Sequence, residues 1–153
     1  MADVVRKVDH FSLQVSNRPG EAFKVLSTLV SAGIDLLACS GSPRGRRAQI
    51  DVVPDDTRKF KAAVKKAGLA FKPEKTGFLI QGEDRPGALA ENLKKLADGG
   101  VDVTAIDGVT GGEGRFGAIL WIESKDVRKA GKLLELQGTG SPHKRGKSDE
   151  QPV

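Results

Sequence analysis

Apolar and polar residues alternate in two short segments, and each segment is followed by a stretch with helical spacing. The segments FSLQV (11–15) and FLIQG (78–82) have the alternation of half-buried strands. Beyond them, apolar residues recur every three or four positions, at 22, 23, 26, 29 and 30 and at 89, 90, 93, 96 and 97. This spacing predicts helices with one buried stripe. Gly33 and Gly100 then stand where a helix C-cap glycine belongs.

The pattern continues in the same order after each of these helices. Further strands are predicted at IDLLACS (34–40), AQIDVV (48–53), VDVTAID (101–107) and FGAILWIE (116–123). PDD (54–56) and SKD (124–126) mark the starts of two more helices. LAFKPEK (69–75) can supply a closing strand to the first series. In the second series that strand is predicted to be short or missing, and residues 138–153 are predicted to form a disordered tail.

The two series are copies of one unit. Residues 11–41 align without gaps with residues 78–108, and 11 of the 31 aligned residues are identical. The order β-α-β-β-α predicts an α+β fold of two tandem ferredoxin-like βαββαβ units, with domains at 1–76 and 77–137. The segment FGAILWIE is apolar on both of its faces, which is typical of a strand buried on both sides. The open face of the sheet is therefore expected to be covered by the other repeat or by a second subunit.

Composition narrows the class of protein. No apolar run approaches the length of a membrane span, the N-terminus has no secretory signal, and Cys39 is the single cysteine. These features predict a cytoplasmic protein. The net charge of +5 is concentrated in the first repeat, notably at RGRR (44–47). RNA binding through this repeat and KRGK (144–147) is a hypothesis that the charge allows without favouring.

Known catalytic patterns are not satisfied. GEGRFG (112–117) matches a dinucleotide fingerprint in letters only, because its glycines precede a strand rather than open a helix. Cys39 and His10 lack a third group that would orient a catalytic pair, and no cluster has metal-ligand spacing. We therefore predict no catalytic residues, no metal, no cofactor and no enzymatic activity.

The repeats share one more feature, a turn between the first strand and the first helix of each copy. It reads NRPG at 17–20 and DRPG at 84–87. A helix N-terminus that follows proline and glycine exposes backbone N–H groups that can hold a carboxylate. Asp84 can accept an ammonium group. The turns therefore fit either end of a free amino acid, and the structural alternative is that Asn17 and Asp84 only cap their helices.

QGEDRPGALAENLKKLADGGVDV (81–103) and, more weakly, QVSNRPGEAFKVLSTLVSAGIDL (14–36) resemble the ACT domain family. The resemblance covers about residues 9–136 and implies a sensor that binds an amino acid between a strand-to-helix turn and a nearby strand. In the second copy it implies ligand contacts at Asp84, Arg85, Pro86, Gly87, Ala88, Leu89, Thr104, Ala105 and Ile106. In the first copy it implies contacts at Asn17, Arg18, Gly20 and Glu21, with Leu37, Ala38 and Cys39. Asn17 departs from the acidic residue of the pattern, so the second turn is the preferred site.

The predicted function is thus that of a non-catalytic regulatory protein. It binds an amino acid or a similar small metabolite, associates with itself, and acts on a separate enzyme or regulator. The alternative hypothesis is a ligand-free module for dimerisation or protein interaction. Binding to a membrane or to nucleic acid is not expected.

Overall fold

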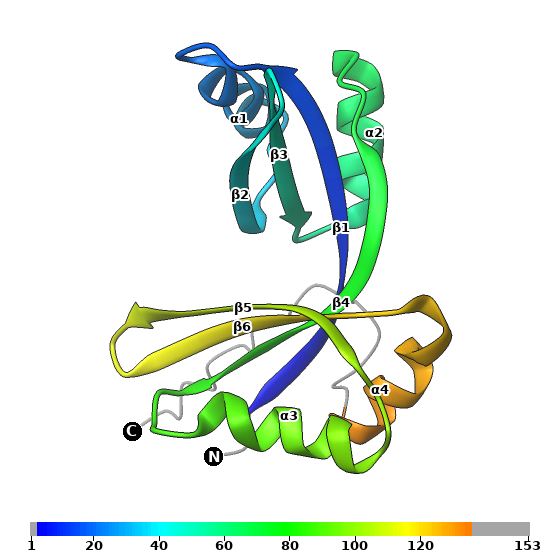
Figure 1. Ribbon diagram of the computed structural model, residues 1–153. Coiled ribbons are helices and arrows are strands. Elements are labelled where there is room, and N and C mark those ends of the chain that lie inside the picture. Colours follow the sequence, from blue (N-terminus) through cyan, green and yellow to red (C-terminus); the bar gives the residue numbers. More distant parts are fainter. Residues whose placement is uncertain (1–2, 136–153) are drawn as a thin grey trace, which may run out of the picture.

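The computed structural model describes residues 3–135, which form an α+β structure around one antiparallel sheet (Figure 1). Its six strands follow the order β2-β3-β1-β4-β6-β5. The strands are β1 (Val4–Ser16), β2 (Leu36–Arg44), β3 (Arg47–Pro54), β4 (Lys72–Glu83), β5 (Val103–Gly112) and β6 (Arg115–Ile122). The helices are α1 (Glu21–Ser31), α2 (Thr57–Ala67), α3 (Ala88–Asp98) and α4 (Val127–Leu133), with a short 3-10 helix at Ser124–Asp126. The expected α+β class is confirmed, and the order is consistent with a ferredoxin-like fold.

The two central strands, β1 and β4, belong to both ends of the sheet. The C-terminal part of β1 pairs with β3, from Phe11 opposite Val52 to Ser16 opposite Arg47. Its N-terminal part pairs with β4, from Val4 opposite Gln81 to Asp9 opposite Thr76. Figure 1 shows both strands running from one group of strands and helices to the other. We call the part with β2, β3, α1 and α2 the first half, and the part with β5, β6, α3 and α4 the second half.

Residues 4–9 are a strand that the sequence pattern did not predict. They lie on the side of β4 opposite β6, which is the position of the fourth strand of the second half. Val5 packs with the helix-side cluster of that half, while Val8 packs with a cluster on the opposite face. A strand whose apolar residues serve opposite faces shows no alternation, so the pattern is silent there. Any strand after α4, and the predicted tail at 138–153, lie outside the described residues.

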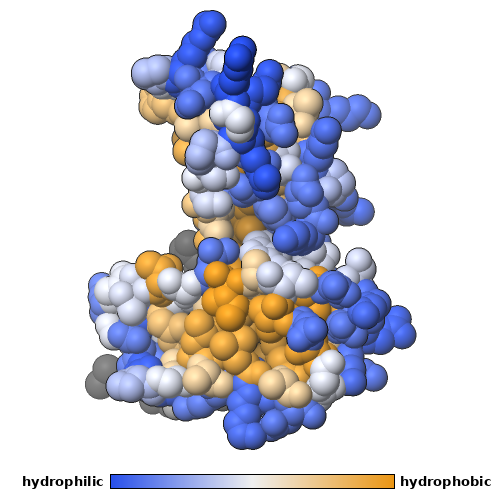
Figure 2. All heavy atoms as spheres, viewed as in Figure 1, coloured by the Kyte–Doolittle hydropathy of each residue, from blue (hydrophilic) through white to orange (hydrophobic). Residues whose placement is uncertain are grey.

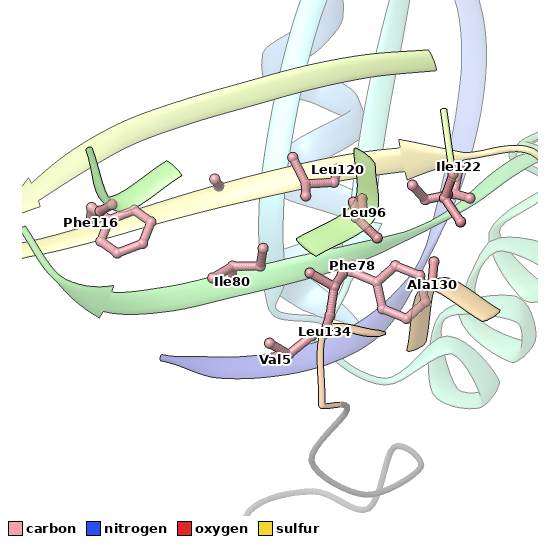
Figure 3. Close-up of a cluster of buried hydrophobic side chains, with 12 residues drawn as sticks. Val5, Phe78, Ile80, Leu96, Phe116, Leu120, Ile122, Ala130 and Leu134 are labelled. Carbon is pink, nitrogen blue, oxygen red and sulfur yellow. The ribbon is translucent and has the colours of Figure 1, made fainter. Parts of the chain in front are cut away.

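Each half has its own core between its helices and the sheet. In the second half, Phe78, Ile80, Leu96 and Leu120 are almost fully buried, and Val5 of β1 joins them (Figure 3). In the first half, Phe11, Leu29, Val52 and Phe60 form the corresponding cluster. The assignment of separate domains to 1–76 and 77–137 stays a prediction, because one continuous sheet connects the two cores.

A third apolar cluster lies on the face of the sheet that carries no helix. It joins Val53 of the first half and Val8 of β1 to Leu79, Ile119 and Trp121 of the second half. Ile119 and Trp121 are 6% and 7% exposed. The helix-free face of the second half is therefore partly covered by residues of the first half, which was one of the two expected covers.

Local signals at the helix ends agree with the structure. Asp56 caps α2, with its side chain accepting a hydrogen bond from Lys59 N at 3.0 Å. Gly33 and Gly100 have φ values of 73° and 74°, in the left-handed region where glycine is favoured. Beside them, Ile34 N donates to Leu29 O and Val101 N donates to Leu96 O, both at 2.9 Å. The expected C-cap glycines are confirmed. No helix within residues 3–135 is both long and apolar enough to cross a bilayer.

Candidate functional site

The twin turns have the same backbone geometry. Gly20 and Gly87 occupy the N-cap positions of α1 and α3 with φ values of 86° and 81°. Neither helix receives a side-chain cap, so Asn17 and Asp84 do not play the capping role considered as the structural alternative. Asp84 is exposed, and its backbone N–H donates to Gly114 O at 2.8 Å. Both turns thus present uncapped helix N-termini, which can bind an anionic group.

The second turn is tied to the beginning of β1. The Arg85 guanidinium donates to Glu91 Oε2 at 2.7 Å and to Glu83 O at 2.9 Å, and it contacts the Asp3 carboxylate at 3.3 Å and 3.4 Å. Asn92, which is 2% exposed, donates to Asp3 Oδ2 at 3.0 Å. Arg85 therefore anchors the N-terminal strand to α3, and its donors are occupied by groups of the protein itself.

These contacts change the acidity of Asp3. Partial burial opposes ionisation, but the hydrogen bonds from Arg85 and Asn92 together hold the pKa of Asp3 below its ordinary value. The ionised carboxylate is thus the form that the folded protein favours. Its contribution to stability is complete above the unfolded pKa of about 3.9 and is lost as the pH falls through the lowered pKa of the folded state.

Asp3→Asn is expected to lower the thermal unfolding temperature at neutral pH by about 3 °C. The difference from the unaltered protein should shrink as the pH falls below about 4 and disappear below the lowered pKa of Asp3 in the folded state, because the native carboxyl group is then protonated as well. Thermal unfolding followed by circular dichroism across this pH range measures both effects. Asp84→Asn, at an exposed carboxylate on the same turn, is the control and should change neither. A pH-independent loss for Asp3→Asn would contradict the ion-pair explanation.

The first turn is open where the second is filled. Ala22 and Gly41 of the first repeat correspond to Leu89 and Gly108 of the second. A β-carbon at Gly108 would lie 3.5 Å from Leu89 Cδ2, so the leucine occupies the space between α3 and β5. At the first turn the smaller alanine leaves a cavity of about 330 Å³. Asn17, Arg18, Glu21, Ala22, Gly41, Ser42 and Gln49 are among its lining residues.

Arg18, unlike Arg85, makes no ion pair with another residue of the described chain and can therefore bind a ligand. Its side chain is exposed and has no ion pair with any residue between 3 and 135. The position of Glu91 is taken in the first repeat by Lys24, and that of Asn92 by Val25, so the partners that hold Arg85 have no equivalents there. The Glu21 side chain lies beside the cavity, 27% exposed and 3.6 Å from Lys24 Nζ.

The strand residues expected beside the turns are not brought to them. Thr104 Oγ1 donates to Trp121 O at 3.0 Å, Ala105 packs with the cluster on the helix-free face, and Ile106 is 41% exposed. Strand β3 is antiparallel to both β1 and β2. Ser16, at the end of β1, pairs with Arg47 of β3, and Arg47 in turn pairs with Arg44 at the C-terminal end of β2. The turn after β1 therefore lies near 41–43, not near 37–39. Which residues of the neighbouring strand lie beside each turn is determined by the sheet order and register, and residue spacing alone does not give these.

The candidates for other chemistry do not form a catalytic pair. His10 Nε2 lies 2.6 Å from Asp51 Oδ1, and partial desolvation together with the neighbouring Asp51 raises the pKa of the Cys39 thiol, although the residue is exposed. A thiol with a raised pKa is a poor nucleophile. Glu113 and Gly114 form the turn of the β5–β6 hairpin, so the first two glycines of GEGRFG precede a strand, as the sequence predicted. Within the described part of the chain, no group of three or more His, Cys, Asp or Glu residues is placed to hold a metal ion.

Comparison with known proteins places this geometry in a structural context. No protein-family model matches the sequence, and no curated protein matches it. Among solved structures, protein BT0572 from Bacteroides thetaiotaomicron superposes with a TM-score of 0.69 at 21% identity, covering 87% of this chain and 88% of that one. The ligand-free regulatory subunit of aspartate kinase from Thermus thermophilus superposes with a TM-score of 0.59 at 17% identity, covering 88% of this chain and 95% of that one. The regulatory subunit of aspartate kinase from Thermus flavus superposes with a TM-score of 0.54 at 17% identity, also covering 88% of this chain and 95% of that one. These similarities support an ACT-like fold and extend over most of each chain.

Proposed function

We propose that this protein is a regulatory, ACT-like protein that binds an amino acid at a strand-to-helix turn. The observation that carries the proposal is the cavity of about 330 Å³ at the first turn, beside an uncapped helix N-terminus and a free arginine. The resemblance of the turn sequences to ACT domains adds the expected ligand class. The structural similarity to regulatory subunits of aspartate kinase supports the regulatory role.

The lining of the cavity suits both ends of an amino acid. The N–H groups at the start of α1 and the Arg18 guanidinium can hold the ligand carboxylate. The Glu21 carboxylate can accept the ammonium group, which is the role predicted for Asp84 in the other repeat. Ser42 and Gln49 supply further polar contacts at the wall of the cavity. The proposal therefore moves the preferred site from the second turn to the first, because the first turn has both space and unpaired groups.

Regulation needs a second protein whose behaviour changes when the ligand binds. The Thermus proteins are regulatory subunits of an amino-acid kinase, so an enzyme is the partner class that this proposal favours. The ligand would act by ordering the turn and the end of β2, which is one edge of the sheet. An edge strand exposes unpaired backbone groups, so its order affects association with another chain.

A screen of the proteinogenic amino acids by thermal shift is expected to find at least one that raises the unfolding temperature, because a ligand selective for the folded state stabilises it. Ala22→Leu should fill the cavity as Leu89 does and reduce the affinity at least about tenfold. Ala90→Leu, at an exposed position on α3, is the matched control. Arg18→Ala should also weaken binding, which isothermal titration calorimetry measures directly.

Two outcomes would redirect the proposal. If Asp84→Ala abolishes binding while Ala22→Leu leaves it intact, the ligand lies at the second turn, as the sequence alone suggested. If no amino acid at millimolar concentration changes the unfolding temperature, the sensor hypothesis fails.

The second candidate function is a ligand-free interaction module. Figure 2 shows apolar side chains gathered on the second half, between β5 and α3. Ile106 on β5 is 41% exposed, and Leu89 and Leu93 of α3 are only partly buried. Together with the outer edge of β5, which pairs with no further strand among residues 3–135, this surface suits association with another chain. This hypothesis expects a flat amino-acid screen and a mass in sedimentation analysis that rises with protein concentration.

A further inference from the structure

A larger cleft lies on the helix-free face, away from both turns. Its volume is about 670 Å³, within the usual range for sites that hold small molecules. Both halves contribute to it, because its lining residues come from β1, β2 and β3 and from β4, β5 and β6. Neither Arg18 nor Arg85 lines it. The cleft exists only because the single sheet bends so that the two helix-free faces approach each other.

Its walls are mainly apolar. Val53, Leu79, Ile119 and Trp121 line the cleft, and all four belong to the cluster that joins the two halves. The Trp121 ring stands 5.1 Å from the His10 ring, measured between centroids, at an interplanar angle of 40°. An indole face of this kind attracts a positively charged group. An apolar body with a cationic end thus fits the walls.

The polar groups that line the cleft beside Trp121 are mostly acceptors. Asp51 Oδ1 is 2.6 Å from His10 Nε2 and accepts from Gln49 Nε2 at 2.8 Å. Because a carboxylate can only accept, Nε2 is assigned as the donor, and Nδ1 is an acceptor wherever the ring carries a single proton. Nδ1 is buried and has no hydrogen-bond partner among residues 3–135. Such an atom is costly to leave unpaired, and a ligand donor would remove that cost.

A second carboxylate, that of Asp107, lies beside the indole nitrogen of Trp121. Asp107 Oδ2 lies 3.4 Å from Trp121 Nε1, a long contact that leaves most of the acceptor capacity of this exposed side chain unused. Asp51 and Asp107 therefore both face the cleft from opposite halves of the sheet. Lys75 and Arg115, both exposed, are the cationic residues that line it.

We propose that this cleft binds a small molecule that carries an ammonium group on an apolar body. The ammonium group is held by the Asp107 and Asp51 carboxylates against the indole of Trp121, and the apolar body lies against Leu79 and Ile119. Lys75 and Arg115 accommodate a carboxylate, so simple amines and apolar amino acids share the required chemistry. This site is separate from the turn site of the proposed function and does not depend on it.

Trp121 makes the proposal directly testable. It is the only tryptophan, and the chain has no tyrosine, so the intrinsic fluorescence reports on the cleft alone. Isoamylamine, leucine and isocaproate share nearly the same branched body, but isocaproate lacks the amine. Titration with isoamylamine or leucine is expected to change the Trp121 emission with saturation, whereas isocaproate should have no saturable effect. Equal binding of isocaproate, or no saturable change with isoamylamine, would overturn the proposal.

Variants tie the signal to the cleft. Asp107→Asn keeps the size of the side chain and removes its charge, and it is expected to weaken isoamylamine binding about tenfold. Asp102→Asn, at an exposed carboxylate just before β5 that does not line the cleft, should bind as the unaltered protein does. His10→Phe retains a ring beside Trp121 and removes Nδ1, so a smaller loss is expected. A folded Asp107→Asn variant, shown by an unchanged thermal transition, that still binds at full affinity would refute the assignment.

The same variants separate this site from the turn site. Ala22→Leu should leave the isoamylamine titration unchanged, because Ala22 does not line the cleft. Conversely, if an amino acid raises the unfolding temperature and Ala22→Leu abolishes that rise, Asp107→Asn should leave the rise unchanged. Loss of the isoamylamine signal in Ala22→Leu, with Asp107→Asn unaffected, would show that the amine binds at the turn and would overturn the cleft site only.

Discussion

Val5→Asp is expected to destabilise the protein by about 4 kcal/mol or more, whereas Val4→Asp on the same strand should change stability by less than about 0.5 kcal/mol. Val5 is 2% exposed and packs with Phe78 and Ile80 in the core of the second half, while Val4 is 49% exposed. The substitution removes apolar burial and places a carboxylate without a partner among apolar side chains. Urea unfolding followed by circular dichroism and by Trp121 fluorescence measures both variants.

The pair tests whether residues 4–9 complete the second half. If these residues were a loose N-terminal extension, the two substitutions would have similar and small effects. The contacts of Asp3 with Arg85 and Asn92 hold the beginning of this strand against α3. A large loss for Val5→Asp would agree with a strand that is held in this way. Equal stabilities of the two variants would contradict the strand pairing.

Gly77→Ala is the second change with a large expected effect, a loss of about 1–3 kcal/mol. A β-carbon at Gly77 would lie 2.7 Å from the backbone oxygen of Leu120 and 2.5 Å from Cε3 of Trp121. The backbone oxygen belongs to the neighbouring strand β6 and cannot turn aside as a side chain would. The substitution therefore pushes β4 and β6 apart beside Trp121, which lines the cleft. Thermal unfolding gives the stability change, and the emission of Trp121 reports its displacement.

Gly117→Ala is the matched control for this prediction. Gly117 lies on β6, paired with Gln81 of β4, and a β-carbon there would meet nothing closer than Ile80 O at 4.0 Å. The same chemical change in the same sheet should be tolerated, with an effect within about 0.5 kcal/mol. A comparable loss in both variants would indicate a general cost of alanine in these strands rather than the specific clash at Gly77.

The two turns have the same backbone geometry but differ in the partners of their arginines and in the space beside them. Both keep the left-handed glycine and an arginine, but Arg85 is occupied by Asp3 and Glu91, whereas Arg18 is free among the described residues. Leu89 fills the space beside β5, and Ala22 leaves the corresponding space open. We therefore interpret DRPG as a structural joint for the N-terminal strand and NRPG as the preferred ligand site.

Most of the secondary structure could be predicted from the sequence because its signals are local. The helical spacing after each turn, the cap at Asp56 and the glycines at 33 and 100 act within a few residues of where they stand. The four expected helices appear at or close to the positions predicted. Strand β4 differs, since the structure joins the predicted segments 69–75 and 78–82 into one strand that begins at Lys72.

The candidate site was less predictable for a physical reason. Sequence spacing identified the turns, and the resemblance to ACT domains implied that Thr104 and Ala105 lie beside the second turn. The strand register instead places both residues at the opposite end of β5 from that turn. Sequence spacing assigned no role to His10, Asp107 or Trp121 in a common cleft, because these residues come from three different strands. Only the bend of the sheet brings them together.

The sequence by itself determined the duplication, the α+β class and the backbone geometry of the two turns. These depend on periodicity and on glycine conformations that neighbouring residues dictate. The tertiary structure alone decided which strand completes the second half, which arginine is free, and where the helix-free faces meet. Those outcomes depend on contacts between residues far apart in the chain, such as Val4 opposite Gln81 and Arg85 with Asp3. Such contacts form only when the whole sheet is assembled.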